Sequence, residues 1–428
     1  MNFFLEFIRQ HKNGNSVGIY SVCSAHPLVI EASLLHAQVT NTKILIEATS
    51  NQVNQDGGYT GMRPKDFCAR VYEIADRINF PHDQILFGGD HLGPNCWTDL
   101  SADAALAKSI VLIDEYVRAG FRKIHLDCSM SCKDDPVPLS DDIVAERAAL
   151  LCLTAENAWN DVGGPAPVYI IGTEVPVPGG AQEELDTLAV TSADAAKTTI
   201  DIHRERFTKA GLDETWSRVI GLVVQPGVEF DHHKVIDYKH DDAVSLSRFI
   251  EDIPNMVFEA HSTDYQTSQN LSKLVVDHFA ILKVGPGLTY ALREALWALD
   301  DVERAWLGAN ASQFKNITLK FMRDNPKYWK AYYEGDDHEV EFACSYSLSD
   351  RIRYYWPEPT IEAALTRMIE NLDNYPPPLT LLSQYMPHQY HAIRQGWINS
   401  DAKSLIIHHI SLTLTDYSDA CHNNRESL

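Results

Sequence analysis

The chain has 428 residues, of which 45% are hydrophobic, enough to bury one large core or two smaller ones. Lysine and arginine number 36 against 59 aspartates and glutamates, which gives a formal net charge of -23. Such an acidic surface repels phosphate backbones and anionic lipids, so neither nucleic acid nor a membrane is expected as a partner. No uncharged run reaches the roughly 18–20 residues that a membrane span requires.

The start of the chain and its cysteines indicate a cytoplasmic protein. Residues 1–10, MNFFLEFIRQ, are apolar but lack a basic beginning and are interrupted by Glu6. We therefore predict an amphipathic helix there and not a signal peptide. The eight cysteines are scattered, and no second pair joins Cys128 and Cys132 to complete a zinc ribbon. Reduced thiols are the expected state of all eight in the cytoplasm.

Eight short, nearly continuous apolar runs are predicted to be strands buried on both faces. In chain order they are Val17–Cys23, Lys43–Ala48, Ile85–Gly89, Arg122–Asp127, Val168–Thr173, Arg218–Val224, Met256–Ala260 and Ala280–Val284. Stretches with helical periodicity alternate with them: Pro27–Val39, Pro64–Ile78, Ala102–Ala119, Asp141–Trp159, Ala193–Ala210, Ala243–Ile253, Leu271–His278 and Leu288–Leu307. Eight β-then-α units predict a (β/α)8 TIM barrel over residues 1–307. A doubly wound open sheet is the alternative, but the count of eight favours closure.

Residues 308–428 lack this alternation. They are rich in aromatic residues and helix formers, as in YWKAYY (328–333) and SDRIRYYW (349–356). We predict a C-terminal helical extension packed on the barrel. Because Tyr, Trp and Arg are enriched at binding hot spots, this extension is a candidate partner surface. That the aromatic residues simply cap the barrel is an equally good interpretation.

Polar residues stand where nearly every predicted strand ends, and the C-terminal strand ends carry the chemistry of TIM barrels. In strand order they are Ser24 and His26, Glu47 with Asn51 and Gln52, Asp90 and His91, Asp127 and Ser129, Thr173 and Glu174, Gln225, Glu259 with His261 and Asp264, and Lys283. Buried polar groups are costly unless they are paired or used. We therefore predict a polar pocket at the barrel mouth.

Two histidines with nearby carboxylates suit Zn²⁺ or another divalent metal. The candidate ligands are His91 and His261, with Glu174 or Glu47 to complete the shell, and Asp90 is the candidate acid/base. Each also has a structural interpretation, because Asp90-His91 could close a turn through hydrogen bonds and His261 could be a satisfied core histidine. No other cofactor is indicated.

Gly285-Pro-Gly287 precedes a predicted helix and could direct backbone amides at a phosphate, with Lys283 supplying positive charge. A plain βα turn is the alternative. A Schiff-base role for Lys283 would need a lowered pKa, which the surrounding carboxylates oppose. The remaining candidate substrate-binding residues are Glu47, Asn51, Asp127 and Ser129.

Several of these stretches resemble the class II, zinc-dependent sugar-bisphosphate aldolases. They are Asp90-His91, LDCS (126–129), IGT (171–173), the strand before His261 and LKV (282–284). The resemblance implies that Asp90 transfers a proton and that His91 and His261 bind zinc. In that family a further zinc histidine follows strand five, and lysine-valine-asparagine leads into the phosphate loop.

The sequence departs from that family at three places. Glu174 or Val175 stands where the zinc histidine of strand five is expected. Ser262-Thr-Asp264 replaces a small glycine-serine phosphate loop, and Gly285 replaces the asparagine that positions substrate. One zinc ligand and parts of two substrate-holding loops are therefore missing or altered.

Longer stretches resemble the non-catalytic, Z-type subunits of D-tagatose-1,6-bisphosphate aldolase over nearly the whole chain. They are IEATSNQ (46–52), GGYTGM (57–62), GGDHLGP (88–94), GTEVPVPGG (172–180), FEAHSTD (258–264) and SLSDRIRYYWP (347–357). The resemblance implies a role in galactitol and N-acetylgalactosamine catabolism, through tagatose 6-phosphate. It also implies a chaperone-like subunit that supports a catalytic Y-type subunit and is inactive, or nearly so, alone.

Two other functions stay open. One is a metal-dependent phosphosugar aldolase or lyase whose site comprises Asp90, His91, Glu174 and His261. The other is a regulatory barrel that binds a phosphorylated ketose through Lys283 and Gly285–Gly287. Members of the Z-type family have also been labelled tagatose-6-phosphate kinases, but the sequence contains no Walker A or kinase-type glycine loop. Association between copies of the chain also stays open.

Overall fold

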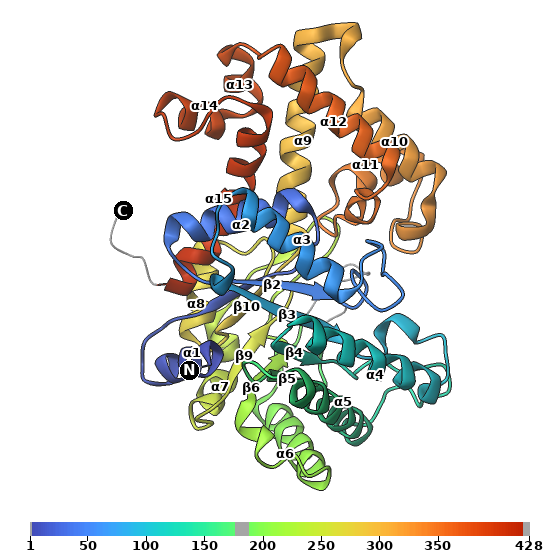
Figure 1. Cartoon of the computed structure of the whole chain (residues 1–428), viewed down its shortest axis with the longest axis vertical. Coiled ribbons are helices and arrows are strands. Elements are labelled where there is room, and N and C mark those ends of the chain that lie inside the picture. Colours follow the sequence, from blue (N-terminus) through green and yellow to red (C-terminus); the bar gives the residue numbers. More distant parts are fainter. Residues whose placement is uncertain (1, 176–187, 423–428) are drawn as a thin grey trace.

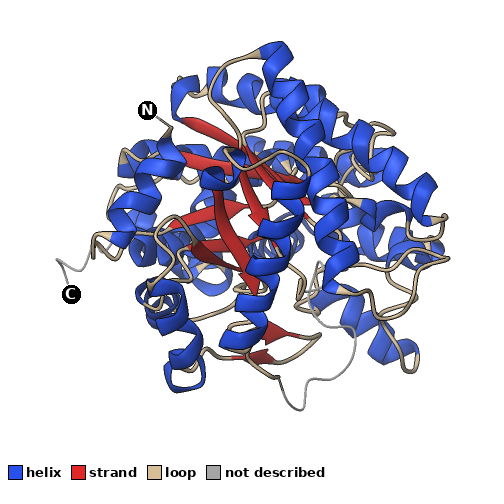
Figure 2. Ribbon diagram, turned by 90° about the horizontal axis from the view of Figure 1, so that it is seen from below, coloured by secondary structure: helices blue, strands red, loops and turns tan. Residues whose placement is uncertain are grey.

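Eight parallel strands close into a barrel at the centre of the computed structural model, which describes residues 2–175 and 188–422 (Figures 1 and 2). Around the barrel, the order is β1 (Ile19–Val22), β2 (Ile44–Thr49), β3 (Ile85–Leu92), β4 (Lys123–Leu126), β5 (Val168–Ile171), β6 (Val219–Val224), β9 (Val257–Ala260) and β10 (Ile281–Val284), which pairs with β1. All eight predicted strands are present, and the TIM barrel is confirmed.

A helix follows each barrel strand and lies outside the barrel (Figure 1). These helices are α2 (Pro27–Thr40), α3 (Pro64–Arg77), α4 (Ala102–Ala119), α5 (Asp141–Val162), α6 (Ala193–Lys209), α7 (His240–Glu251), α8 (Ser268–Val276) and α9 (Pro286–Leu307). Serine side chains begin three of them, because Ser101, Ser140 and Ser192 each accept an otherwise unpaired backbone N–H of the first turn.

The inside of the barrel has an apolar lower layer and a charged upper layer. Residues two apart on a strand share a face, so Leu45 and Glu47 of β2 both point inward, as do Ile281 and Lys283 of β10. The apolar layer continues into α1 (Phe3–Lys12), which is the predicted first helix and buries Phe4, Phe7 and Ile8 in the same cluster. The charged layer lies nearer the C-terminal ends of the strands, at the barrel mouth.

The chain after residue 307 is helical and packs on the barrel (Figure 1). Its helices are α10 (Phe314–Asp324), α11 (Asp337–Tyr346), α12 (Pro359–Asn374), α13 (Leu379–Tyr385), α14 (Pro387–Arg394) and α15 (Ala402–His422). The last of these returns to the barrel and contacts α2, α8 and α9, and the N–H of Gly18 donates to the carbonyl of Cys421 at 2.8 Å. Helix α9 ends at Leu307, and residues before and after this point share one apolar cluster.

A two-stranded antiparallel sheet, β7 (Glu229–Phe230) and β8 (Val235–Ile236), follows β6 and was not predicted. Positions 176–180 of the GTEVPVPGG stretch lie outside the described residues. Within the described parts of the chain, every helix is too short or too polar to cross a membrane.

Candidate functional site

A small pocket of about 80 Å³ lies at the C-terminal mouth of the barrel. Residues that the sequence singled out line it, among them Asn51, Gln52, Asp90, His91, His261, Asp264, Lys283 and Gly285. The helical extension contributes Arg353 and Tyr354 to its wall, and Tyr59 comes from the loop after β2. The predicted convergence of polar groups at the barrel mouth is therefore present in the structure.

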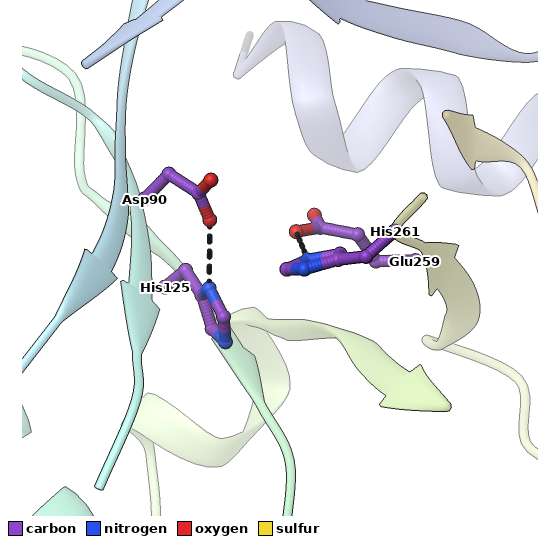
Figure 3. A group of neighbouring side chains, drawn as sticks. All are labelled: Asp90, His125, Glu259 and His261. Carbon is purple, nitrogen blue, oxygen red and sulfur yellow. Dashed lines mark hydrogen bonds and ion pairs between the residues drawn. The ribbon is translucent and has the colours of Figure 1, made fainter. Parts of the chain in front are cut away.

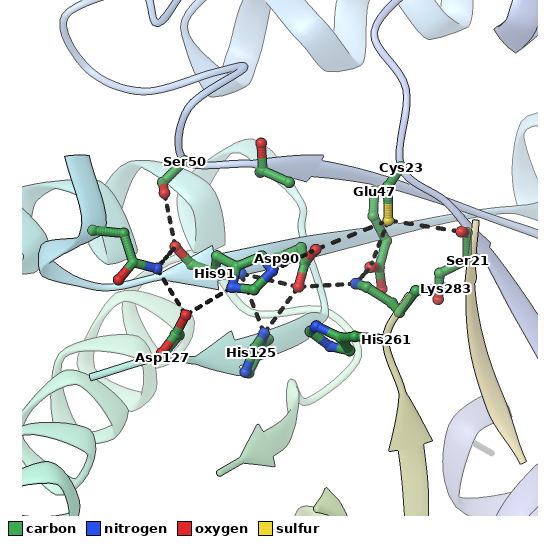
Figure 4. A network of polar contacts seen from close by, with 12 residues as sticks. Ser21, Cys23, Glu47, Ser50, Asp90, His91, His125, Asp127, His261 and Lys283 are labelled. Atoms are coloured by element: carbon green, nitrogen blue, oxygen red, sulfur yellow. Dashed lines mark hydrogen bonds and ion pairs between the residues drawn. The ribbon is translucent and has the colours of Figure 1, made fainter. Parts of the chain in front are cut away.

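At the base of this pocket, five charged side chains form what we call the ionic layer: Glu47, Asp90, Lys123, Glu259 and Lys283. Figure 4 shows Glu47, Asp90 and Lys283 of this layer. The Lys123 ammonium lies 2.8 Å from Glu47 Oε1 and 2.6 Å from Glu259 Oε2. The Lys283 ammonium lies 2.9 Å from Asp90 Oδ1 and also pairs with Glu47. Because isolated buried charges are very costly, this mutual pairing is what allows the layer to be buried.

Three histidines, His91, His125 and His261, meet beside the ionic layer, with ring centroids 5.0 to 5.3 Å apart. Each histidine has one short contact with a different carboxylate: His91 with Asp127 at 2.7 Å, His125 with Asp90 at 2.9 Å and His261 with Glu259 at 3.0 Å (Figures 3 and 4). His91 Nε2 also lies 3.7 Å from Asp90 Oδ2. Asp127 and Glu259 are completely buried. These carboxylates fix the orientation of the three rings.

The proposed acid/base Asp90 is held in its ionised form. Burial raises the pKa of this carboxyl, but His91 and Lys283 outweigh burial and bring the pKa well below its usual range. A residue that transfers protons near neutral pH needs a pKa close to that pH. In this arrangement Asp90 is an ion-pair partner more than a proton donor.

The same electrostatics keep Lys283 protonated. Burial lowers the pKa of its ammonium, but Asp90, Cys23 and Glu47 raise the pKa well above its usual value. A nucleophilic lysine requires the opposite shift. The neighbouring carboxylates therefore oppose a Schiff-base role for Lys283.

The backbone amides of the predicted phosphate loop are occupied by a side chain of the chain itself. The N–H groups of Gly285 and Gly287 donate to Asp264 Oδ1 at 2.9 and 2.7 Å. A carboxylate at the N-terminus of α9 takes the position that a phosphate occupies at such helix ends. This finding speaks against the substrate-binding role predicted for Gly285 and Gly287.

Glu174 and Ser129 lie away from the pocket. The Glu174 side chain is exposed and accepts a hydrogen bond from the Thr191 hydroxyl at 2.5 Å. The Ser129 hydroxyl donates to Asp127 Oδ1 at 2.7 Å, and both Ser129 and Glu174 line a separate, open depression. The structure therefore does not assemble the predicted metal ligands His91, Glu174 and His261.

A different group could hold a metal ion: Asp90, His125, Glu259 and His261, which are all buried and offer ligand atoms within 4.8 Å of one another (Figure 3). Two nitrogens and two oxygens suit Zn²⁺ or another divalent metal. His125 Nε2 is buried and has no hydrogen-bond partner among the described residues, and burial lowers the pKa of His261 to about 4, which leaves it neutral. The residues therefore fit such an ion, which would have to compete with the two lysines of the ionic layer.

Lys123, His125 and Arg353 are among the residues of the site that were not predicted. Lys123 and His125 lie two apart on β4, and both are completely buried. Two polar residues at this spacing in a strand covered by helices indicate an inward-facing polar pair, so this signal was available in the sequence. Arg353 belongs to the helical extension, and no local pattern connects it with the barrel mouth.

The model of one protein family, D-tagatose-1,6-bisphosphate aldolase subunit GatZ/KbaZ-like, matches residues 4–422. A crystal structure described as a probable tagatose 6 phosphate kinase from Sinorhizobium meliloti 1021 is 48% identical, with a TM-score of 0.88 over 94% of this chain and 100% of that one. The YdjI aldolase from Escherichia coli K12 is 11% identical, with a TM-score of 0.44 over 88% of this chain and 97% of that one. Similarity at that level says nothing about the chemistry of either barrel. The chain belongs to the GatZ/KbaZ-like family of D-tagatose-1,6-bisphosphate aldolase subunits.

Proposed function

We propose that this chain is the non-catalytic subunit of a D-tagatose-1,6-bisphosphate aldolase. It supports the activity and stability of a separate, zinc-dependent catalytic subunit in the tagatose 6-phosphate branch of galactitol and N-acetylgalactosamine catabolism. A cytoplasmic location agrees with its eight free cysteines. The observation that carries the proposal is the closure of the α9 N-terminus by Asp264.

Closure by Asp264 acts on substrate binding in two ways. The carboxylate uses the amides of Gly285 and Gly287, and its negative charge repels a phosphate that approaches the same helix end. The pocket beside it is also small, at about 80 Å³, whereas sites for small organic ligands typically measure about 300 Å³ or more. A ketose with two phosphates does not fit this pocket as it stands.

The state of Asp90 supports the same proposal. Cleavage of a carbon–carbon bond next to a carbonyl needs a group that gives and takes a proton at working pH. Asp90 is instead paired with Lys283 at 2.9 Å and contacts His125 at 2.9 Å. These contacts stabilise a permanently charged carboxylate, which is a structural role.

A metal-dependent lyase is the second candidate, and one observation favours it: the buried group of Asp90, His125, Glu259 and His261. A divalent ion bound there would supply Lewis acidity to a carbonyl oxygen. His125 and His261 would hold the ion through nitrogen. Metal analysis of the purified protein and of His261→Ala tests this candidate, since stoichiometric metal in the first and none in the second would support it. If the wild-type protein stays metal-free after incubation with zinc, this second candidate function is wrong.

Neither remaining interpretation is supported by a contact in the structure. The groups that a regulatory phosphosugar site would use, Lys283 and the amides of Gly285 and Gly287, already bind side chains of the chain. The kinase activity in the description of the Sinorhizobium meliloti protein would need a phosphate loop. The sequence has neither a Walker A motif nor a kinase-type glycine loop.

The partner role is tested by reconstitution with the Y-type catalytic subunit of the same host. The cleavage rate of D-tagatose 1,6-bisphosphate and the half-life of that activity at raised temperature are measured with and without this chain. An unrelated protein at equal mass is the control. We expect both quantities to rise only with this chain, together with co-elution of the two subunits. If neither changes and the subunits elute separately, the proposal is wrong.

A further inference from the structure

A second, larger pocket separates the barrel from the helical extension. Its volume is about 430 Å³, within the range of small-molecule sites. The N-terminal part of α2 forms one wall and α12 forms the opposite wall, with Leu28 on one side and Ile361 and Leu365 on the other. Tyr59 and Arg353 line this pocket and also the small pocket at the barrel mouth. The two pockets are therefore neighbours.

Arg353 is a cation without a carboxylate partner in this wall. Its Nη1 donates to the backbone carbonyls of Ser349 and Asp350, and its Nη2 lies 3.1 Å from the Tyr354 hydroxyl. Within residues 2–175 and 188–422, no carboxylate lies within ion-pair distance of it. Asp350 and Asp264 act on Arg353 only through longer-range attraction, and both are engaged elsewhere. Because a half-buried guanidinium gains most from a bound anion, this is where an anionic group would be recognised.

The charge of the pocket points the same way. Its ionisable lining comprises Arg70 and Arg353 against Glu362, while burial lowers the pKa of His26 to about 4 and leaves that ring neutral. The lining thus has one more positive than negative group, in a chain whose formal charge is -23. Arg70 also pairs with Glu73 at 3.8 Å, so Arg353 is the main source of this positive charge. Opposite charge in a cleft of an otherwise acidic protein concentrates anions there.

The rest of the lining is mixed: one wall is apolar and aromatic, whereas Ser24, Thr60, Thr289 and Thr366 contribute hydroxyl groups. Trp356 is 5% exposed, and its indole N–H is buried with no acceptor among the described residues. Leu365 and Ile369 extend the apolar wall along one face of α12. An aromatic or hydrocarbon body against the apolar wall and an anionic group at Arg353 would together fit this lining.

We propose that this pocket is a binding site for a small organic anion, a phosphate or carboxylate attached to an aromatic or hydrocarbon body. The anionic group lies at Arg353, and the body lies between α2 and α12. Because Arg353 and Tyr59 also form the wall of the small pocket, the ligand contacts residues of the barrel mouth. The site is independent of the subunit role proposed above.

Phenyl phosphate is a suitable probe, and isothermal titration calorimetry on the full chain is a suitable measurement. We expect saturable binding of phenyl phosphate, with weaker binding of inorganic phosphate and of phenol. Arg353→Gln should weaken binding about tenfold or more, as expected for the loss of a charge-assisted hydrogen bond. Leu365→Glu, which places a negative charge in the half-buried wall, should have a similar effect.

Arg323→Gln is the matched control, because Arg323 is an exposed arginine of the same extension and pairs with Glu341 away from the pocket. This variant should bind phenyl phosphate as the wild type does. Three results would overturn the proposal: no saturable binding by the wild type at millimolar probe, equal affinity for inorganic phosphate, or undiminished binding by Leu365→Glu. The last result decides the question even if Arg353→Gln fails to fold.

Discussion

Asp264 Oδ1 accepts the backbone N–H of Gly287 at 2.7 Å, so the N-terminus of α9 is closed by a carboxylate of the chain itself. Gly285 donates to the same oxygen at 2.9 Å. In a barrel related to sugar-phosphate enzymes, this helix end is the natural place for a phosphate. In this structure the two amides therefore bind a side chain of the chain itself.

Removing the carboxylate should uncover an anion site. We expect Asp264→Ala to bind inorganic phosphate at millimolar concentration, because the amides of Gly285 and Gly287 lose their acceptor. The rise in melting temperature with added phosphate measures this binding. Asp264→Asn is the control, since its amide oxygen can still accept both hydrogen bonds. A phosphate response that is equal in wild type and Asp264→Ala would show that Asp264 does not block the site.

The same carboxylate should make stability depend on pH. Burial raises the pKa of Asp264 from 3.8 to about 6, although the two amides hold it down. A raised pKa means that the folded protein favours the neutral, protonated carboxyl. The contribution of this group to the free energy of unfolding is therefore fully present below pH 4 and is lost as the pH rises through 6. At pH 7.5 we expect Asp264→Asn to unfold at a higher urea concentration than the wild type. Its free energy of unfolding should be larger by about 1–3 kcal/mol. The difference should shrink towards zero at pH 4, and a difference that grows at pH 4 would contradict this sign.

The ionic layer should be sensitive to the loss of one partner. Lys123 is completely buried between Glu47 and Glu259, so Lys123→Met leaves buried carboxylates short of a cation. We expect a loss of about 3–5 kcal/mol in the free energy of unfolding. Lys197→Met removes an exposed lysine paired with Asp201 and should cost at most about 1 kcal/mol. Equal losses in urea denaturation would mean that the layer is not held by these ion pairs.

Helix α15 should behave as part of the barrel. Leu414 of α15 is completely buried, whereas Leu412 in the same helix is 37% exposed. We expect Leu414→Ala to lower the free energy of unfolding by about 2–5 kcal/mol and Leu412→Ala by less than about 1 kcal/mol. Both variants should unfold in one transition. A separate early transition in Leu414→Ala would instead indicate that the C-terminal extension is an independent domain.

The barrel could be predicted because its strands are buried on both faces and therefore read as continuous apolar runs. Lys123 and His125 were missed although their spacing on β4 indicates an inward-facing pair, because the rule about strand ends applies only to residues at or after the end of a strand. The convergence of Asp90, His91 and His261 could be predicted because residues at the C-terminal ends of barrel strands meet at one mouth. This rule could not show that Glu174 turns outward to Thr191.

Two features of the site depend on contacts that no local pattern encodes. Asp264 was recognised as a departure from a phosphate loop, but only the structure shows that its oxygen fills the vacated position. Arg353 reaches the mouth because the extension folds back over the barrel, across many residues of sequence separation. Long-range packing decides both outcomes.

The most direct test is aldol cleavage by the pure chain. D-tagatose 1,6-bisphosphate is incubated with the chain and with added zinc, and triose phosphate release is followed next to that of the Y-type subunit and of the mixture. We predict no release by the chain alone and faster release by the mixture than by the Y-type subunit. Robust cleavage by the chain alone, with zinc bound in stoichiometric amount, would contradict the non-catalytic role.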